Sequence, residues 1–165
     1  MDIGPPGTSL AGEVSRGNIV VLRSFGKFFG LAGLRLGFAL AAPAIAARIA
    51  ALLGPWAVSA PALKAGAEAL ADRAWIGRTR LSLAQAATRL DAILAGSGLD
   101  IVGGTPLFRL VRAPAASELF HHLGRAGILV RVFAEQPAWL RFGLPARAPE
   151  WRRLEIAMAA WSDNG

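Results

Sequence analysis

The sequence contains no cysteine and no tyrosine, and only two of its 165 residues are lysine. Without cysteine there is no disulfide framework and no thiolate nucleophile or metal ligand. Apolar runs are short, since Arg48 separates the charge-free stretches 36–47 and 49–63, which proline and glycine also interrupt. A membrane helix needs roughly 18–20 apolar residues. The sequence therefore predicts no transmembrane span and no membrane partner.

The start of the chain has no basic segment followed by an apolar one, which is the pattern of a secretory signal. The absence of cysteine fits a reducing compartment. Together these features favour a cytoplasmic protein.

Positive charge exceeds negative charge, with 18 lysines and arginines against 11 acidic residues and a net charge of +7. The arginines are scattered from Arg16 to Arg153 without a dense basic run, and no aromatic residues are interleaved with them as stacking platforms. This pattern does not favour nucleic-acid binding. A positive balance suits an enzyme that binds a phosphorylated cofactor and an anionic substrate.

The first part of the chain is expected to alternate strands and helices. Residues 1–17 are rich in glycine and proline and predict a loop. The β-branched run 19–22 is typical of a parallel strand covered on both faces, and 34–40 predicts a second buried strand. Helices are expected at 43–53, from Ser59 as the N-cap to 72, and at 73–95.

The composition changes after the glycines near residue 97. Beyond them the pattern predicts a small sheet with helices on one side, an α+β layer. Strands are expected at 100–102, 107–111, 128–132 and 139–142, and helices at 116–126 and 149–161. Residues 103–106 are expected to form the turn between the first two strands.

Lys27 lies in the segment S-F-G-K-F-F-G, among phenylalanines and glycines. Apolar surroundings favour the neutral, nucleophilic form of an amine. Ser24 lies three residues before it and Arg35 eight after, so a hydroxyl and a guanidinium accompany the amine. We interpret this set as an amine nucleophile beside a phosphate-binding clamp, which is the chemistry of pyridoxal phosphate. The alternative is a core segment whose lysine side chain only reaches out to solvent.

The order S-x-x-K followed by G-L-R-x-G resembles the lysine motif of fold-type I pyridoxal 5′-phosphate enzymes, the class I/II aminotransferase superfamily. The resemblance implies that Lys27 is the catalytic residue that carries the cofactor, and that Ser24 and Arg35 bind the cofactor phosphate. It also implies an α/β fold. The chain would hold the C-terminal part of a mostly parallel large domain (1–72), an interdomain helix (73–98) and a small α+β domain (99–165).

Two further arginines lie on otherwise apolar predicted strands, Arg131 in I-L-V-R and Arg141 in W-L-R-F-G. If these strands pair, both guanidinium groups would project toward one pocket. Bidentate recognition of a carboxylate is the most natural use of such arginines. The resemblance extends here, because the superfamily places a substrate-carboxylate arginine in a strand of its small domain, in a context that Arg141 matches. Arg131 matches a second arginine that one branch of the superfamily has. The alternative is structural ion pairing.

The resemblance is closest to the threonine-phosphate decarboxylases of cobalamin biosynthesis, through residues 21–38, 55–59, 103–110, 127–133 and 139–145. It implies decarboxylation of L-threonine O-3-phosphate, a small phosphorylated amino acid, to aminopropanol phosphate. Histidinol-phosphate-type aminotransferase is the alternative.

The family supplies its pyridinium-binding aspartate and its ring-stacking aromatic residue upstream of the lysine strand, and neither is found here. Asp2 is a poor substitute, and Met1 is interpreted as an internal start or an artificial boundary of the chain. A second alternative is therefore an inactive fragment or pseudoenzyme domain. Exposed apolar surface would then favour self-association, and the family resemblance implies a homodimer.

Overall fold

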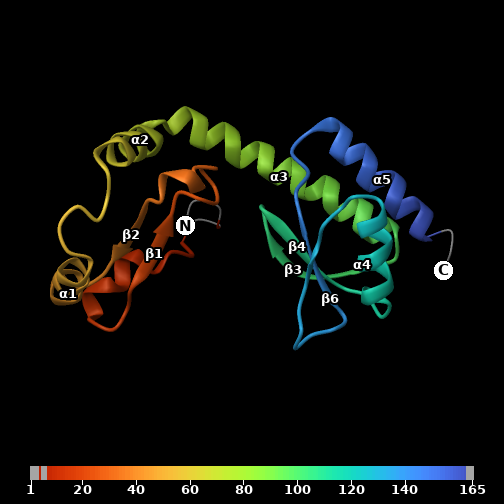
Figure 1. Cartoon of the computed structure of the whole chain (residues 1–165), viewed down its shortest axis with the longest axis horizontal. Coiled ribbons are helices and arrows are strands. Elements are labelled where there is room, and N and C mark those ends of the chain that lie inside the picture. Colours follow the sequence, from red (N-terminus) through yellow and green to blue (C-terminus); the bar gives the residue numbers. More distant parts are fainter. Residues whose placement is uncertain (1–3, 5–6, 163–165) are drawn as a thin grey trace. The chain divides into compact units, whose positions relative to one another are not determined.

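The computed structural model describes residue 4 and residues 7–162, and its contacts divide the chain into two compact units, Met1–Gly77 and Arg78–Gly165. Figure 1 shows the elements of each unit along the chain. Asp2, considered above as a cofactor ligand, lies outside the described residues. No helix among the described residues is long and apolar enough to cross a membrane.

The described residues of the first unit form a two-stranded antiparallel sheet, two 3₁₀ helices and two α-helices, followed by the start of a third α-helix. Its elements are the 3₁₀ helix Leu10–Arg16, β1 (Val21–Ser24), the 3₁₀ helix Ala32–Leu34, β2 (Gly37–Leu40), α1 (Pro43–Leu53), α2 (Ala60–Ala71) and the first residues of α3 (Arg73–Gly96). The prediction of loop throughout 1–17 is wrong, because Ser9 caps a 3₁₀ helix by accepting a hydrogen bond from the Ala11 amide.

The strand expected at 19–22 is displaced and has a different character. β1 begins at Val21, pairs antiparallel with β2, and alternates half-buried with exposed residues. Leu22 on this strand is 78% exposed. The prediction of a parallel strand covered on both faces is therefore wrong for this segment. β1 pairs antiparallel, and the described residues cover one of its faces.

An aromatic cluster forms the core of the first unit. Phe25, Phe28 and Phe29 are buried, and the rings of Phe28 and Phe29 lie 5.5 and 5.8 Å from that of Trp75 at the start of α3. Gly66 of α2 lies so close to Leu36 that an added Cβ would be 2.3 Å from Leu36 Cδ2. These contacts hold the segment between β1 and β2 against α2 and α3.

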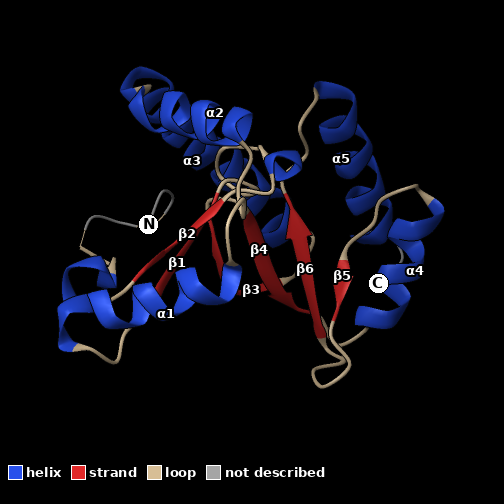
Figure 2. Cartoon of the chain, turned by 60° about the vertical axis from the view of Figure 1, so that its left-hand side comes forward, coloured by secondary structure: helices blue, strands red, loops and turns tan. Residues whose placement is uncertain are grey.

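The second unit is a four-stranded antiparallel sheet with helices packed on one face. Its elements are the rest of α3, β3 (Asp100–Thr105), β4 (Phe108–Arg112), α4 (Ala116–Arg125), β5 (Arg131–Val132), β6 (Trp139–Gly143) and α5 (Ala148–Ser162). Figure 2 shows the strands side by side in the order β3-β4-β6-β5. The expected α+β layer is therefore confirmed for this part of the chain.

The core of the second unit combines one face of the sheet with all three helices. Val111, Leu140 and Phe142 supply the sheet face, and buried leucines from α3 and α4 pack on it with the inner face of α5. Because side chains alternate along a strand, Arg141 lies on the opposite face from its neighbours Leu140 and Phe142.

Two local predictions in this unit are wrong. β3 continues to Thr105, so the turn consists of Pro106 and Leu107 rather than of residues 103–106. Gly104 reaches φ +155° there, with Phe108 O 2.5 Å from where a Cβ would lie, so glycine permits strand pairing. The strand expected at 128–132 is reduced to the two residues of β5.

Candidate active site

The predicted cofactor residues of the first unit lie in the turn that joins β1 to β2. β1 ends at Ser24, and the Phe25 carbonyl accepts a hydrogen bond from the Leu31 amide at 2.9 Å. The Lys27 carbonyl accepts one from the Gly30 amide at 3.0 Å. The turn therefore has a fixed backbone that presents Lys27 at its tip.

Lys27 is exposed, whereas the phenylalanines on either side of it are buried. The prediction of apolar surroundings for the lysine side chain is therefore wrong in this structure. The rings of Phe28 and Phe29 turn inward toward Trp75, and the turn leaves Lys27 on the outer side. The amine is accessible to a small molecule that approaches the turn.

Ser24 and Arg35 are linked through a short chain of contacts across the same turn. The Ser24 Oγ accepts a hydrogen bond from the Gly26 amide at 3.1 Å. Gly26 packs against Ala32, where an added Cβ would be 3.2 Å from Ala32 Cα. The Arg35 Nη1 in turn donates to the Ala32 carbonyl at 3.1 Å. The Ser24 hydroxyl and the Arg35 guanidinium therefore both form hydrogen bonds with the backbone of this turn.

Arg35 does not lie in a strand as the sequence predicted. Its backbone has φ +50° and ends the 3₁₀ helix Ala32–Leu34 in the left-handed conformation, and its side chain is exposed. Non-glycine residues rarely adopt this conformation. Gly37 then starts β2, where a side chain would meet the Arg23 carbonyl at 2.8 Å. The G-L-R-x-G motif is therefore an irregular turn and not a buried strand.

The chemistry of this turn fits a phosphorylated aldehyde. Residues 24–37 contain a hydroxyl, an amine and a guanidinium but no carboxylate. Because the Ser24 Oγ accepts its recorded bond, its own proton is available to an anion. The donors suit a phosphate, and the exposed amine of Lys27 suits a carbonyl group.

Arg131 and Arg141 come together in the second unit. β5 and β6 pair antiparallel with Arg131 directly opposite Arg141. Arg141 is half-buried and Arg131 is exposed. Cross-strand partners have Cβ atoms about 4.5–5.5 Å apart on the same face of the sheet. Both guanidinium groups therefore start from the face that the helices leave uncovered.

Sequence reasoning missed the apolar neighbours of this arginine pair. Leu110 of β4 is the other register partner of Arg141, and the Phe108 ring centroid lies 5.2 Å from the Arg141 guanidinium carbon. Both are half-buried on the face opposite the core. The alternation in F-R-L-V-R was the available signal, because it puts Phe108 and Leu110 on one face and Val111 on the other.

The sequence profile of the family described as aminotransferase class I and II matches residues 4–157. The chain belongs to this family. The turn of Lys27 and the pair Arg131–Arg141 both lie within the residues that this profile matches.

Two curated relatives illustrate the range of this aminotransferase family. A threonine-phosphate decarboxylase of Sinorhizobium sp is 49% identical over 158 residues, covering 93% of this chain and 46% of that protein. A histidinol-phosphate aminotransferase of Anaeromyxobacter sp. (strain Fw109-5) is 35% identical over 141 residues, covering 83% of this chain and 39% of that protein. The chain spans less than half the length of both relatives.

The fold agrees with the family assignment. The solved L-threonine-O-3-phosphate decarboxylase from Porphyromonas gingivalis matches with a TM-score of 0.76 and 22% identity, over 99% of this chain and 53% of that one. The α/β fold class expected from the sequence, that of part of an aminotransferase-type enzyme, is therefore confirmed.

Proposed function

We propose that this chain forms the cofactor-lysine segment and the small domain of a pyridoxal 5′-phosphate enzyme that decarboxylates L-threonine O-3-phosphate. The observation that carries the proposal is the 49% identity to a threonine-phosphate decarboxylase, against 35% to a histidinol-phosphate aminotransferase. Aminopropanol phosphate, a unit used in cobalamin biosynthesis, would be the product.

The turn of Lys27 would hold the cofactor. Lys27 would bind its aldehyde carbon, while the Ser24 hydroxyl and the Arg35 guanidinium would bind its phosphate. Pyridoxal phosphate supplies an electron sink for the pair of electrons left when a bond to the substrate Cα breaks.

Arg131 and Arg141 would hold the substrate carboxylate and thereby select the bond that breaks. A bidentate contact from a guanidinium would fix the direction of that carboxylate. Lys27 would supply a proton to the substrate carbon once carbon dioxide has left, and water would return that proton to the lysine. Phe108 and Leu110 would fix the direction of the Arg141 side chain.

A homodimer and a cytoplasmic location belong to the same proposal. The family resemblance supports the first and the absence of cysteine supports the second. Sedimentation of the purified chain, with and without the cofactor, measures the oligomeric state.

The two lysines of the chain make a direct test possible. The purified chain would be titrated with pyridoxal phosphate, reduced with borohydride and mapped by mass spectrometry. Lys27 and Lys64 are both exposed, so Lys64 is a matched control for reactivity without a phosphate clamp. We expect the label on Lys27, with Lys64→Arg unchanged and Lys27→Arg unlabelled. Equal labelling of both lysines would count against a cofactor site.

Product analysis separates decarboxylation from transamination. Incubation with L-threonine O-3-phosphate should yield aminopropanol phosphate and carbon dioxide, measured by phosphorus NMR and mass spectrometry. An oxo acid formed when 2-oxoglutarate is supplied as amino acceptor would favour the aminotransferase, the function of the 35% identical relative.

A non-catalytic fragment is the second candidate, and a specific observation favours it. Leu22 of β1, Leu52 of α1 and Trp56 are 78%, 87% and 96% exposed. Exposed apolar side chains that lie together form a surface that another polypeptide can cover. Co-expression with the N-terminal half of the Sinorhizobium relative tests this candidate: activity found only in the mixture would show that this chain supplies an incomplete site.

A further inference from the structure

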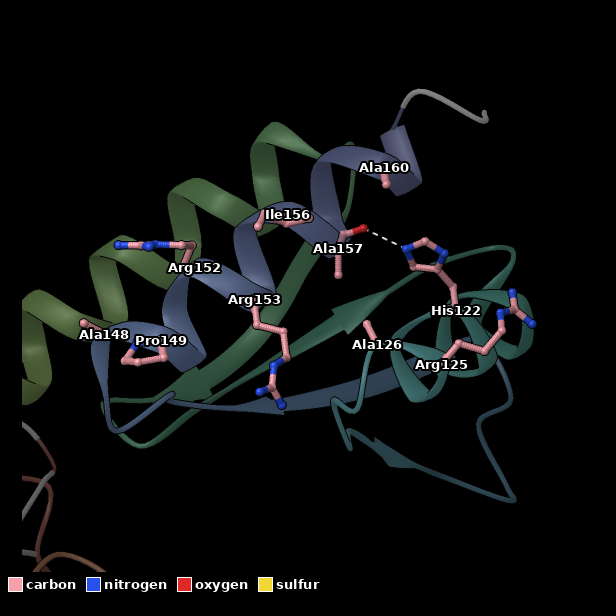
Figure 3. Close-up of a pocket in the computed structure, with 10 residues that line it drawn as sticks. All are labelled: His122, Arg125, Ala126, Ala148, Pro149, Arg152, Arg153, Ile156, Ala157 and Ala160. Carbon is pink, nitrogen blue, oxygen red and sulfur yellow. Dashed lines mark hydrogen bonds between the residues drawn. The ribbon is translucent and has the colours of Figure 1, made fainter.

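A groove between α4 and α5 lies on the second unit, among residues that the proposed function does not use. Its volume is about 700 Å³. Figure 3 shows Ala126 at the end of α4 facing Ala157 of α5 across this space. Ile156, which is 64% exposed, and Pro149 extend the apolar lining along α5. The volume is that of a small-molecule site, and its floor is apolar.

The rim of the groove is positively charged. Arg125, Arg152 and Arg153 line it together with His122, and none of the described residues that line it is acidic. No carboxylate among the described residues forms an ion pair with these three arginines. Charge complementarity therefore favours an anionic occupant.

Arg153 is the central cation. Figure 3 shows its side chain extending downward from α5, between Arg152 on the left and Arg125 on the right. The Arg153 Nη1 would be 3.5 Å from a Cβ added at Gly127, which places the guanidinium against the loop after α4. A planar guanidinium in this position presents several donors to one carboxylate or phosphate.

A neighbouring cavity of about 310 Å³ also contains Arg153 but is less suited to an anion. Glu150 lines it, and this carboxylate accepts hydrogen bonds from the Ala146 and Arg147 amides. Its negative charge disfavours a second anion there. The larger groove is therefore the better place for the apolar body of a ligand.

We propose that the α4–α5 groove binds an amphipathic anion, with an aliphatic or aromatic body on the floor formed by Ala126, Ile156 and Ala157 and a carboxylate or phosphate on Arg153. This proposal is independent of the lysine turn and of the reaction proposed for it.

The test is an NMR titration of the ¹⁵N-labelled chain with dodecanoate and with dodecyl phosphate, each below its critical micelle concentration. The two compounds share one apolar body and distinguish the carboxylate from the phosphate headgroup. Dodecyltrimethylammonium has the same body with the opposite charge and serves as the ligand control. We expect amide shifts at Ala126, Gly127 and Ala157 with either anion, and much weaker binding of the cation.

Matched variants test which residue binds the headgroup of the ligand and which residue forms the apolar floor. Arg153→Gln should weaken anion binding by about ten-fold or more, the loss expected for a charge-assisted hydrogen bond. Arg78→Gln, at an exposed arginine of α3, should leave it unchanged. Ala126→Leu should fill the groove and abolish binding, and circular dichroism would verify that the variant remains folded.

Three results would overturn the proposal. The first is equal affinity for the anion and for the cation of the same chain length. The second is an Arg153→Gln variant that binds as the unsubstituted chain does. The third is a set of shifts confined to the exposed apolar residues of the first unit, such as Leu22 and Leu52, which would show adsorption to another surface.

Discussion

Arg131 of β5 and Arg141 of β6 are direct register partners, so two like charges lie opposite each other on the uncovered face of the sheet. Like charges placed directly opposite each other destabilise a sheet. Each guanidinium also lies over an aromatic ring, with Phe133 5.7 Å from Arg131 and Phe108 5.2 Å from Arg141. The arrangement suits an anion that both arginines bind at once.

A double-mutant cycle with Arg131→Gln and Arg141→Gln should show this coupling. In chloride we expect a repulsion of roughly 0.2–1 kcal/mol between the two arginines in the free energy of unfolding. Succinate at equal ionic strength should stabilise the unsubstituted chain more than either variant, because a carboxylate bridges the pair. Urea denaturation measures both effects. An Arg112→Gln control, which breaks an ion pair with Asp100, should keep the succinate effect.

Arg35 combines an unfavourable backbone with a proposed ligand role, and one substitution separates them. Arg35→Gly should leave the free energy of unfolding unchanged or raise it by up to about 1 kcal/mol, because glycine adopts φ +50° without strain. The same change should weaken pyridoxal phosphate binding by about ten-fold or more. Arg35→Lys, which retains the charge and the strain, is the control. A loss of stability in Arg35→Gly would show that the side chain is mainly structural.

Gly66 allows α2 to approach the segment between the strands of the first unit. Gly66→Ala should lower the free energy of unfolding by about 1–3 kcal/mol, because the new Cβ would lie 2.3 Å from Leu36 Cδ2 and 3.4 Å from Phe25. Gly77→Ala in α3 is a matched control with no heavy atom within 4 Å, and it should stabilise by about 0.5–1 kcal/mol. Chemical denaturation compares the two. Equal effects would mean that α2 shifts freely to make room.

The stability of the folded chain depends on pH through Glu150, in the first turn of α5. A hydrogen bond from the Arg147 side chain, and then those from the Ala146 and Arg147 amides, hold the pKa of Glu150 below its ordinary value of 4.5. A carboxyl with a lowered pKa in the folded state adds stability above its unfolded pKa. That stability is lost as the pH falls through the folded pKa, below 4.5.

Thermal unfolding at a series of pH values tests this assignment. Glu150→Gln should melt at a lower temperature than the unsubstituted chain at pH 7, and the difference should shrink as the pH falls below 4.5. Arg147→Gln should show part of the same effect, since it removes the main cause of the lowered pKa. Arg152→Gln, at an exposed neighbour, should follow the unsubstituted chain. A gap between Glu150→Gln and the unsubstituted chain that stays constant with pH would contradict the assignment.

Local chemistry made several elements predictable from the sequence. The helix expected at 43–53 is α1, because Pro43 suits the first helical position and Gly54 ends the helix with φ +70°. Ser59 caps α2 as expected, and its Oγ accepts a hydrogen bond from the Ala62 amide at 3.3 Å. These features depend on neighbours a few residues away, which the sequence displays directly.

The family and the candidate residues also came from the sequence, since spacing alone defines the motif of Ser24, Lys27 and Arg35. The exposure of Lys27 and the left-handed backbone of Arg35 were decided by tertiary structure. Phe28 and Phe29, beside Lys27, turn inward because they pack against Trp75, which lies nearly fifty residues further along the chain. The approach of α2 to this segment depends on Gly66. Likewise, two strands had to pair in one register before Arg131 and Arg141 became partners. Contacts between distant residues set these directions, and no local pattern contains them.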